Sequence, residues 1–362
     1  MIQLKDLCQK ASSNIAQKDL EGHEGQYPIY GASGLIGYVD FYKQENPYVA
    51  VVKDGAGIGR VMCLPEKSSV IGTMQYILPN EGVNVHYLAF AMEHMNLAKY
   101  FSGATIPHIY FKDYGKEKLL ERTEKEQKSI AEILSKMDSL ISLRKQQLAK
   151  LDELVKARFV EMFGDVISNS NLWPICKFSE ITSSRLGKML DAKQQTGVHR
   201  YPYLANFNVQ WFRFELKTLN SMDFNESDRI EFELHDGDLL VCEGGEIGRC
   251  AVWHNNVQPC YFQKALHRVR CNKDFILPDF LAWWFKYNCD HGGFSAIEGA
   301  KATIAHLPGA KLKNLDVCVP PLSHQNQFAD FVERVDQQKQ TVQQSLEKLE
   351  LMKKALMQEY FG

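Results

Sequence analysis

The 362-residue sequence lacks the features that would assign it to a membrane or to the secretory pathway. No apolar run approaches the roughly 18 residues of a transmembrane helix, and the N-terminal residues contain no apolar signal segment. Nine cysteines are scattered without a single C-x-x-C pair. This pattern is typical of reduced thiols in a reducing compartment. The sequence therefore predicts a cytoplasmic protein without a membrane segment.

An excess of one charge and the common catalytic motifs are also lacking. The 42 Lys and Arg nearly balance the 44 Asp and Glu, which excludes a uniformly basic nucleic-acid coat but allows a local basic surface. Neither G-x-S-x-G nor H-E-x-x-H occurs. Glycine-rich segments at 31–37 and 55–60 match neither the dinucleotide-binding pattern nor the P-loop. Tight turns are favoured there, with phosphate contact by backbone amides as the alternative. No catalytic, cofactor or metal site is predicted.

The sequence does contain an internal repeat. Near the start, Leu4, Asp6, Leu7, Tyr27 and Pro28 match Phe178, Glu180, Ile181, Tyr201 and Pro202, at an offset of 174. A glycine-rich turn ending at Arg60 recurs at Arg249, and His108 recurs as His306 at an offset of 198. That last offset then stays constant to the end of the repeat. Because insertions accumulate in loops, each repeat is predicted to be a variable domain followed by a rigid element.

The rigid element is predicted to be a long helix. Residues 123–162 contain no Pro or Gly, and apolar residues recur in steps of four and three in both copies, as in a coiled coil. The predicted seam consists of Ile130, Leu134, Met137, Ile141, Leu148, Leu151 and Val155 in the first copy, and of Phe328, Val332, Val335, Val342, Leu346, Leu349 and Leu356 in the second. Charged residues interrupt both seams, Arg144 and Arg158 in the first and Lys339 and Lys353 in the second.

Local signals mark the helix ends. Thr123 with Glu126 predicts a capping box, Ser323 predicts the second cap, and Gly164 and Gly362 predict the two ends.

A helix of about 40 residues is roughly 60 Å long, which exceeds a compact domain. We expect the two helices to pair as an antiparallel coiled coil, with the two domains at opposite ends of a pseudo-two-fold dumbbell. An ordinary amphipathic helix of one domain is the alternative. A second apolar stripe, Ile133, Leu140 and Leu154, is predicted to meet the globular parts or another subunit.

The globular parts are predicted to be α+β domains. Short β-rich runs separated by glycine turns occupy residues 27–78 and 201–270, and a helix is expected after each, near 86–100 and 278–288. The predicted organisation is a first domain at 1–115, a central helix at 116–164, a second domain at 165–321 and a last helix at 322–362.

A variable domain followed by a long helix, occurring twice in one chain, resembles the specificity subunit of type I restriction–modification systems. The motifs that carry the resemblance are YPIYGASG at 27–34, GIGR at 57–60, RFVEMFG at 158–164, DGDLL at 236–240, EIGR at 246–249 and VPPL at 319–322. The first domain lacks the Pro-Pro-Leu before its helix. The resemblance covers essentially the whole chain. It implies two target-recognition domains, each reading one half of an asymmetric bipartite site in double-stranded DNA, while the coiled coil sets the spacer.

The resemblance also implies partner subunits. Two adenine methyltransferase subunits would bind the helices, with the second apolar stripe as a docking surface, and two motor–nuclease subunits would complete the enzyme. The chain itself would be non-catalytic and would bind no cofactor. S-adenosylmethionine, ATP and Mg are expected on the partner subunits. A system that methylates without restricting remains open.

Polar and basic residues near the glycine turns and loops are the candidates for DNA contact, because Lys and Arg suit phosphates and Asn reads base edges. The candidates are Ser33, Tyr38, Lys53, Arg60, Arg185, Lys188, Asn206, Asn208, Arg249 and Lys301. The matched Arg60 and Arg249 predict a shared task such as phosphate contact. The alternative is a turn-fixing salt bridge with Asp54 and Glu243.

Two other functions fit the sequence. A non-catalytic scaffold could bind protein and dimerise through the coiled coil, or an enzyme could use the glycine turns on a nucleotide. The first predicts no sequence-specific DNA binding, and the second predicts that a nucleotide stabilises the chain.

Overall fold

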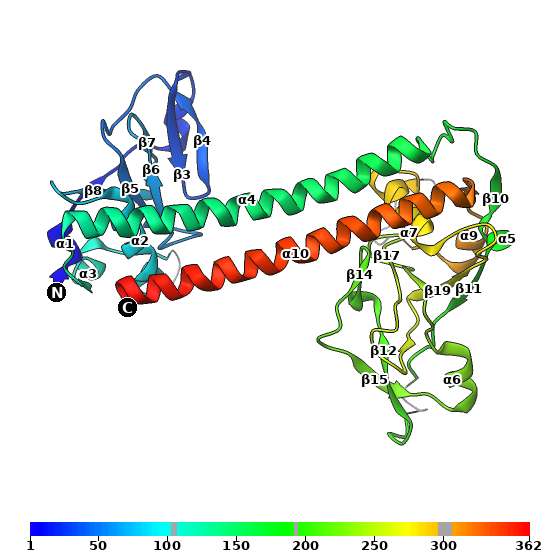
Figure 1. Ribbon diagram of the computed structural model, residues 1–362. Coiled ribbons are helices and arrows are strands. Elements are labelled where there is room, and N and C mark those ends of the chain that lie inside the picture. The colour runs from blue at the N-terminus through cyan, green and yellow to red at the C-terminus, as the bar shows by residue number, and fades with distance from the viewer. Residues whose placement is uncertain (103–106, 192–194, 296–305) are drawn as a thin grey trace. The chain divides into compact units, whose positions relative to one another are not determined.

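The computed structural model describes residues 1–102, 107–191, 195–295 and 306–362 (Figure 1). The chain forms two compact units, one from residues 1–148 with 341–362 and the other from residues 149–340. Each unit therefore combines one globular domain with a segment of each long helix. None of the helices in the described ranges is long and apolar enough to cross a bilayer.

The first repeat runs through short strands and helices into one long helix. Its elements are β1 (Ile2–Gln3), α1 (Leu4–Leu7), β2 (Cys8–Ser12), η1 (Gln17–Leu20), β3 (Tyr27–Gly31), β4 (Gly34–Val39), β5 (Tyr48–Val52), β6 (Val61–Leu64), β7 (Ser69–Val70), β8 (Met74–Pro79), α2 (Val85–His94), η2 (Leu97–Tyr100), α3 (Phe111–Tyr114), β9 (Lys118–Leu119) and α4 (Glu124–Phe163).

The second repeat follows the same plan with additions. Its elements are β10 (Ile175–Lys177), α5 (Phe178–Ile181), β11 (Thr182–Leu186), β12 (Arg200–Leu204), η4 (Asn206–Asn208), β13 (Val209–Gln210), β14 (Arg213–Phe214), β15 (Asn220–Asp223), α6 (Glu226–Phe232), β16 (Leu239–Cys242), β17 (Cys250–Val252), β18 (Tyr261–Phe262), β19 (Leu266–Cys271), α7 (Pro278–Asp290), α9 (Gly309–Lys313), β20 (Asp316–Cys318) and α10 (Leu322–Phe361).

The sequence repeat is a repeat of sheet topology. The first unit has a four-stranded sheet of order β2-β8-β5-β6 and a three-stranded sheet of order β4-β3-β7. The second unit has β11-β19-β16-β17 and β15-β12-β18 in the same order. In both small sheets the middle strand makes one antiparallel and one parallel pair. The predicted α+β domains are confirmed, and the β13–β14 pair and α6 occur in the second repeat alone among the described elements.

The core of the first unit is completed by both long helices. All five residues of the central strand β5 are buried, and α2 packs Tyr87 and Leu88 against them. Leu134 of α4 and Phe361 of α10 belong to the same apolar cluster. Helix stability therefore comes from tertiary burial in the globular core as well as from the helix pair.

The ends of the long helices correct two predictions. Thr123 caps α4 as expected, because its Oγ1 accepts the N–H of Glu126 (3.3 Å) while its own N–H donates to Glu126 Oε2 (2.8 Å). The helix begins at Glu124 and not near 116, since Lys118–Leu119 form strand β9 against β1. α10 begins at Leu322, so Ser323 lies within the first turn and is not its cap. Its first turn closes on Pro321, whose carbonyl accepts the N–H of His324 (2.9 Å).

The predicted seam is covered along both helices. Nine of its residues are buried: Ile130, Leu134, Met137, Leu151, Val155, Phe328, Val335, Val342 and Leu346. The other five are partly buried: Ile141, Leu148, Val332, Leu349 and Leu356. The spacing of apolar residues therefore predicted correctly which face of each helix is buried.

Within each unit the two helix segments run antiparallel. In the first unit, Asp138 contacts Lys353 (2.7 Å) and Lys145 contacts Glu350 (2.9 Å), so residue numbers rise on one helix as they fall on the other. In the second unit, Asp152 contacts Lys339 (2.6 Å). The lysines that interrupt the apolar seam are thus the ion-pair partners of aspartates on the facing helix, which specifies the register of the pair.

Candidate DNA-recognition surface

Two arginines at matched positions make the same contact in both units. Arg60 Nη1 donates to the carbonyl oxygen of Ala32 (2.6 Å), and Arg249 Nη2 donates to that of Asn206 (3.1 Å). Ala32 and Asn206 follow β3 and β12, and they are related by the same offset of 174 as those strands. Each arginine therefore ties a glycine turn to the loop that follows the middle strand of the small sheet. We call this contact the arginine tie.

The alternative salt bridges to Asp54 and Glu243 are not present. Asp54 instead contacts Lys53 Nζ (3.3 Å) and forms a short hydrogen bond with His108. Arg249 Nη1 lies 3.9 Å from Glu246. The arginine tie therefore links the glycine turn to a second loop, whereas a salt bridge to Asp54 or Glu243 would stay within the turn.

Backbone hydrogen bonds show that the second turn is one residue shorter. The N–H of Ile109 donates to the carbonyl of Lys53 (3.0 Å), and the equivalent N–H of Leu307 donates to that of Glu243 (2.6 Å). Lys53 is therefore the counterpart of Glu243, although the sequence motifs had aligned Asp54 with it. The two turns, 53–59 and 243–248, consequently differ in length and in charge at their first residue.

The first-unit candidates lie on the β3–β4 hairpin and on the glycine turn between β5 and β6. Ser33 is exposed in the turn between β3 and β4, and Tyr38 of β4 is 55% exposed. Arg60 is exposed beside them through its bond to Ala32. Lys53 is mostly covered and paired with Asp54. The structure thus brings Ser33 and Arg60 together and leaves Lys53 less accessible.

In the second unit, two basic candidates are neutralised by acids of α6. Arg185 pairs with Glu231, and Lys188 pairs with Asp228. The side chain of Lys188 is only 11% exposed and lies over the Phe224 ring (5.3 Å), so it contributes little free positive charge. Arg185 remains half exposed.

Asn208 is not available to DNA, which corrects its prediction as a contact residue. It is completely buried. Its Oδ1 accepts the N–H of Ala205 (2.9 Å), and its Nδ2 donates to the carbonyls of Glu215 (2.8 Å) and Thr218 (3.0 Å). A buried amide whose hydrogen bonds are satisfied holds a loop in shape. Asn206 is partly exposed, with its Nδ2 donating to the carbonyl of Gly244 (3.1 Å). Lys301 lies outside the described residues.

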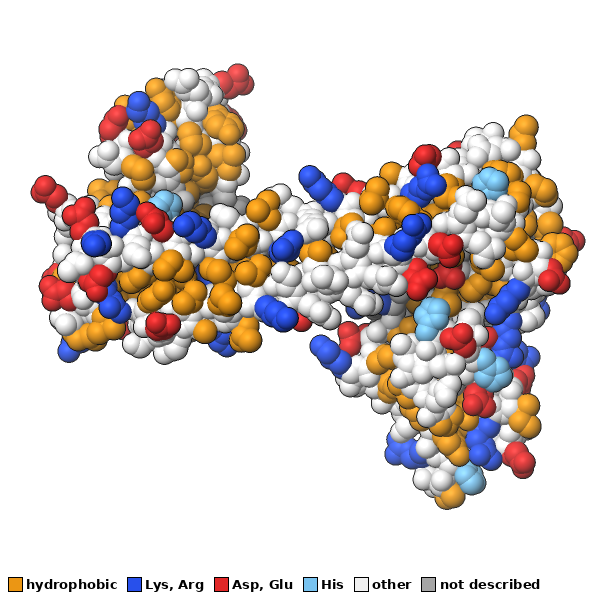
Figure 2. Space-filling view, viewed as in Figure 1, with side chains coloured by type: hydrophobic (Ala, Val, Ile, Leu, Met, Phe, Trp, Pro, Cys, Tyr) orange, Lys and Arg blue, Asp and Glu red, His pale blue; other side chains and the backbone are white. Residues whose placement is uncertain are grey.

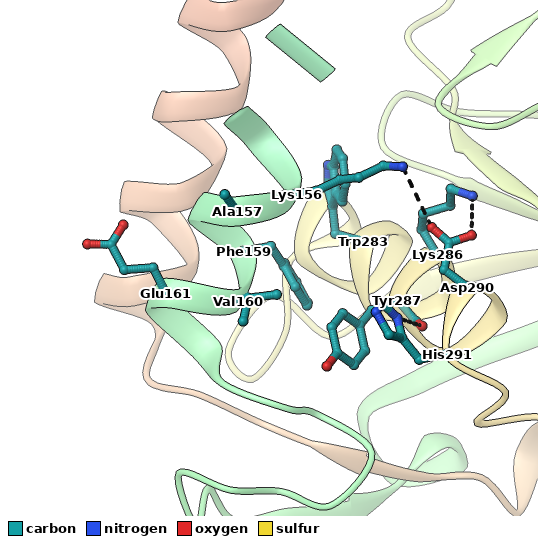
Figure 3. Close-up of a pocket in the computed structure, with 10 residues that line it drawn as sticks. All are labelled: Lys156, Ala157, Phe159, Val160, Glu161, Trp283, Lys286, Tyr287, Asp290 and His291. Atoms are coloured by element: carbon teal, nitrogen blue, oxygen red, sulfur yellow. Dashed lines mark hydrogen bonds and ion pairs between the residues drawn. The ribbon is translucent and has the colours of Figure 1, made fainter. Parts of the chain in front are cut away.

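A cavity of about 740 Å³ opens in the second unit between α4 and α7 (Figure 3). Phe159, Trp283 and Tyr287 form apolar walls, and His291 stacks on Tyr287 with ring centroids 4.1 Å apart. Asp290 lies at its edge, where it contacts Lys286 (2.5 Å) and Lys156 (4.0 Å). An apolar socket with paired charges at its rim suits an apolar side chain of a partner better than a polar substrate.

Comparison with known proteins assigns the family. A family model described as the type I restriction modification DNA specificity domain matches residues 1–153 and 171–351. This chain belongs to that specificity family. The two matched ranges follow the two repeats of the sequence, so each repeat carries one copy of the domain. The resemblance stated from the motifs is therefore confirmed.

Named relatives agree with the specificity family. A curated protein of Methanocaldococcus jannaschii, named as a type I restriction enzyme MjaX specificity subunit, is 24% identical over 176 residues. That match spans 48% of this chain and 41% of the relative. The fold is similar to the S subunit of a type I restriction–modification system from M. genitalium, with a TM-score of 0.65, 15% identity, and coverage of 100% of this chain and 95% of that chain. A chain from a study of assembly and conformational transition of a type I R-M system has a TM-score of 0.57, 12% identity, and coverage of 99% and 96%.

Two glutamines in this specificity-family chain escaped the sequence analysis. Gln127 and Gln325 lie in the first turns of α4 and α10, at the same offset of 198 as the helices, and both are buried. Gln127 Oε1 accepts the N–H of Asn84 before α2 (3.1 Å), and Gln325 Oε1 accepts that of Leu277 before α7 (2.8 Å). A search for identical polar residues at the constant offset would have found them. They attach each long helix to its own globular domain.

Arginines of β19 were also missed. Arg268 stands directly opposite Arg185 in the strand register, and Arg270 binds Asp238 through Nε (2.7 Å) and Nη2 (3.2 Å). Burial is the main reason that the pKa of the Arg268 guanidinium is lowered, and the positive charge of the neighbouring Arg270 lowers it further. Arg268 and Arg270 are two residues apart in one strand, and this spacing indicates that both side chains lie on the same face of the sheet. Asp238 neutralises Arg270 and Glu231 neutralises Arg185, so this face gathers arginines but carries little free positive charge.

Proposed function

We propose that this chain is the DNA-specificity subunit of a type I restriction–modification system, in which each globular domain reads one half of a bipartite site in double-stranded DNA. The observation that carries the proposal is the repeated arginine tie beneath exposed loops of different sequence. The same support under loops that differ between the two repeats is what two recognition surfaces on one scaffold require. The family assignment supports the same conclusion.

The two halves of the site are proposed to differ. The first unit presents the uncharged β3–β4 hairpin, whereas the second presents the β13–β14 pair and the ion-paired arginine of β11. Ser33, Tyr38 and Arg60 are the proposed contacts in the first half. Arg185 and Asn206 are those in the second, with Arg249 holding the loop. Different side chains at the DNA predict an asymmetric site.

Methyltransferase subunits are proposed to dock on the exposed apolar stripe of α4. Ile133 and Leu140 are exposed on the first-unit segment, and Leu154 with Val160 on the second-unit segment. Figure 2 shows hydrophobic side chains gathered over the helices of the first unit. The cavity beside Val160 gives the second-unit segment a socket. One docking surface in each unit suits two copies of an adenine methyltransferase, with two motor–nuclease subunits completing the enzyme.

The chain itself is proposed to be non-catalytic. S-adenosylmethionine, ATP and Mg would be held by the partner subunits in the cytoplasm. The antiparallel helix pair would set the spacer between the two half-sites, because its ion pairs hold one register.

The test is a map of methyladenine in the source cell with and without this gene. We expect a split, asymmetric motif to disappear on deletion, and a chimera with residues 174–321 taken from another recognition subunit to change one half of the motif only. Deletion of the partner methyltransferase gene is the matched control. An unchanged map while that methyltransferase is active, together with capture of an unrelated protein by the chain, would favour a protein-binding scaffold instead.

A further inference from the structure

The β3–β4 hairpin of the first unit exposes apolar side chains without any charge. Residues 27–39 contain no Asp, Glu, Lys, Arg or His. Leu35 is 51% exposed, Ile36 39% and Tyr38 55%. β4 is the edge strand of its sheet, with β3 as its hydrogen-bonded neighbour. Edge strands are normally protected by charge, because an exposed apolar edge invites aggregation. Because this edge has no charge to protect it, we expect a binding partner to cover it.

The apolar tip is built into the backbone of the hairpin. The strand register shifts between Ile29 and Tyr30, so that Leu35 faces Tyr30 and Gly37 faces Ile29. Ile36 is left between them without an opposite residue. A Cβ at Gly31 would lie 2.9 Å from Ile36 Cδ1, so the glycine leaves space for this side chain. Leu35 and Ile36 are thus adjacent exposed residues at a bulge, where the alternation of side chains along a strand is interrupted.

The charge beside the tip indicates which partner covers it. Arg60 is held at the tip by its bond to the carbonyl of Ala32, and its exposed guanidinium adds positive charge next to the apolar ribbon. A two-stranded ribbon fits the major groove of DNA, where the thymine methyl group is the one apolar feature among hydrogen-bonding groups. Hydrophobic side chains on the visible face of the lobe that carries β3 and β4 agree with this assignment (Figure 2).

We propose that Leu35 and Ile36 contact thymine methyl groups in the half-site read by the first unit, with Arg60 on an adjacent phosphate. This inference rests on the proposed function. It assigns at least one thymine to that half-site. In the second unit the antiparallel partner of β12 is β15, and η4 with the β13–β14 pair lies between them in the chain, so the described residues form no tight hairpin like β3–β4 there. The assignment therefore concerns the half-site read by the first unit.

The experiment measures binding of the complete methyltransferase complex to its mapped site and to the same DNA with deoxyuridine in place of thymine, one half at a time. Loss of one methyl contact is expected to weaken binding about three- to fourfold. The Leu35→Ala/Ile36→Ala double variant should bind both DNAs equally well. Leu35→Met keeps an apolar side chain and should still prefer thymine. Leu172→Ala, at a leucine that is 87% exposed outside the hairpin, is the matched control.

Two results would overturn the assignment while leaving the proposed function intact. One is equal binding of thymine and deoxyuridine DNA by the wild-type complex. The other is an undiminished preference in the double variant. A double variant that fails to assemble with the methyltransferase would show that the ribbon contacts protein, which also overturns the assignment. If the wild-type complex selects no bipartite site, the proposed function and the ribbon assignment both fail.

Discussion

At the scale of single residues, we propose that Arg249 supports DNA recognition through the loop that it holds by its bond to the carbonyl of Asn206. We expect Arg249→Ala to weaken binding to the second half-site about tenfold, since a hydrogen bond from a charged group contributes roughly 1.5 kcal/mol. Binding to the first half-site should not change. Competition between DNAs altered in one half at a time measures both effects.

Arg144→Ala is the control for this variant, because Arg144 lies on α4 and contacts Gln147 of the same helix (2.8 Å). An equal loss at both half-sites would contradict the assignment, since the arginine tie of each unit supports its own loops. Arg60→Ala should give the reciprocal pattern, with the first half-site affected.

Asp279 in the first turn of α7 is expected to make stability depend on pH. Burial raises the pKa of its carboxyl above the ordinary 3.8, and Asp336 adds to the effect while His254 opposes it. The ionised form is therefore disfavoured in the folded state. Stability contributed by the protonated form is lost as pH rises from the ordinary pKa through the raised one.

Asp279→Asn should consequently raise the Tm at neutral pH, and the gain should shrink as the pH falls toward the ordinary carboxyl range. Thermal unfolding across pH measures this, with the exposed Asp274→Asn as the control. The helix dipole at the first turn favours a charge there. A lower Tm at neutral pH would show that the dipole exceeds the cost of burial.

At the scale of elements, the glutamine in the first turn of α10 anchors that helix to its domain. Gln325 also donates to the carbonyls of Phe275 (2.9 Å) and Pro320 (2.7 Å). Gln325→Ala leaves these groups and the N–H of Leu277 unpaired, and we expect it to cost about 3 kcal/mol of unfolding free energy. Denaturant unfolding measures the loss. Gln343→Ala, on the exposed face of the same helix, should change stability little.

The helices were predictable because their signals are local. Heptad spacing specified the buried face, and the Thr123 capping box is formed by residues three apart. The prediction of Ser323 as a cap was wrong because residue type alone does not identify a cap. A cap at Ser323 would start the helix at residue 324, whereas α10 starts two residues earlier, at Leu322. The α7 helix was expected close to its observed ends, whereas α2 ends at His94 and the expected stretch to residue 100 is completed by the separate η2.

The sheets and the recognition surface were less predictable because they depend on distant segments. Parallel pairing of β3 with β7 joins residues about 40 apart, and no periodicity reports it. Burial of Asn208 follows from carbonyls of later loop residues, which the spacing of Asn and Arg could not show. The arginine tie was missed for the same reason, although the matched arginines were found.

At the scale of the whole molecule, the helix pair is expected to act as a spacer. Insertion of one heptad in each helix, between Lys145 and Asp152 of α4 and between Lys339 and Glu350 of α10, adds about 10.5 Å of helix. We expect the methylated motif to gain about three base pairs of spacer at roughly 3.4 Å each, with both halves unchanged. Sequencing of methyladenine sites measures the result.

An unchanged spacer would refute this role. Insertion of a heptad in α4 alone is the control, because it moves Lys145 away from Glu350 and should lower stability without producing a new ordered motif.

The composition of the first unit has a consequence for synthesis of the chain. Its core contains Phe361, which packs on Tyr87 with ring centroids 5.3 Å apart, and this segment is translated only after the entire second unit. At typical rates, the intervening residues take roughly 10 to 40 s to make. Throughout that interval the apolar surface around Tyr87 and Leu134 lacks its cover. The domain begun first by the ribosome is therefore the one completed last, and nascent chains are most exposed to chaperones and to aggregation at that stage.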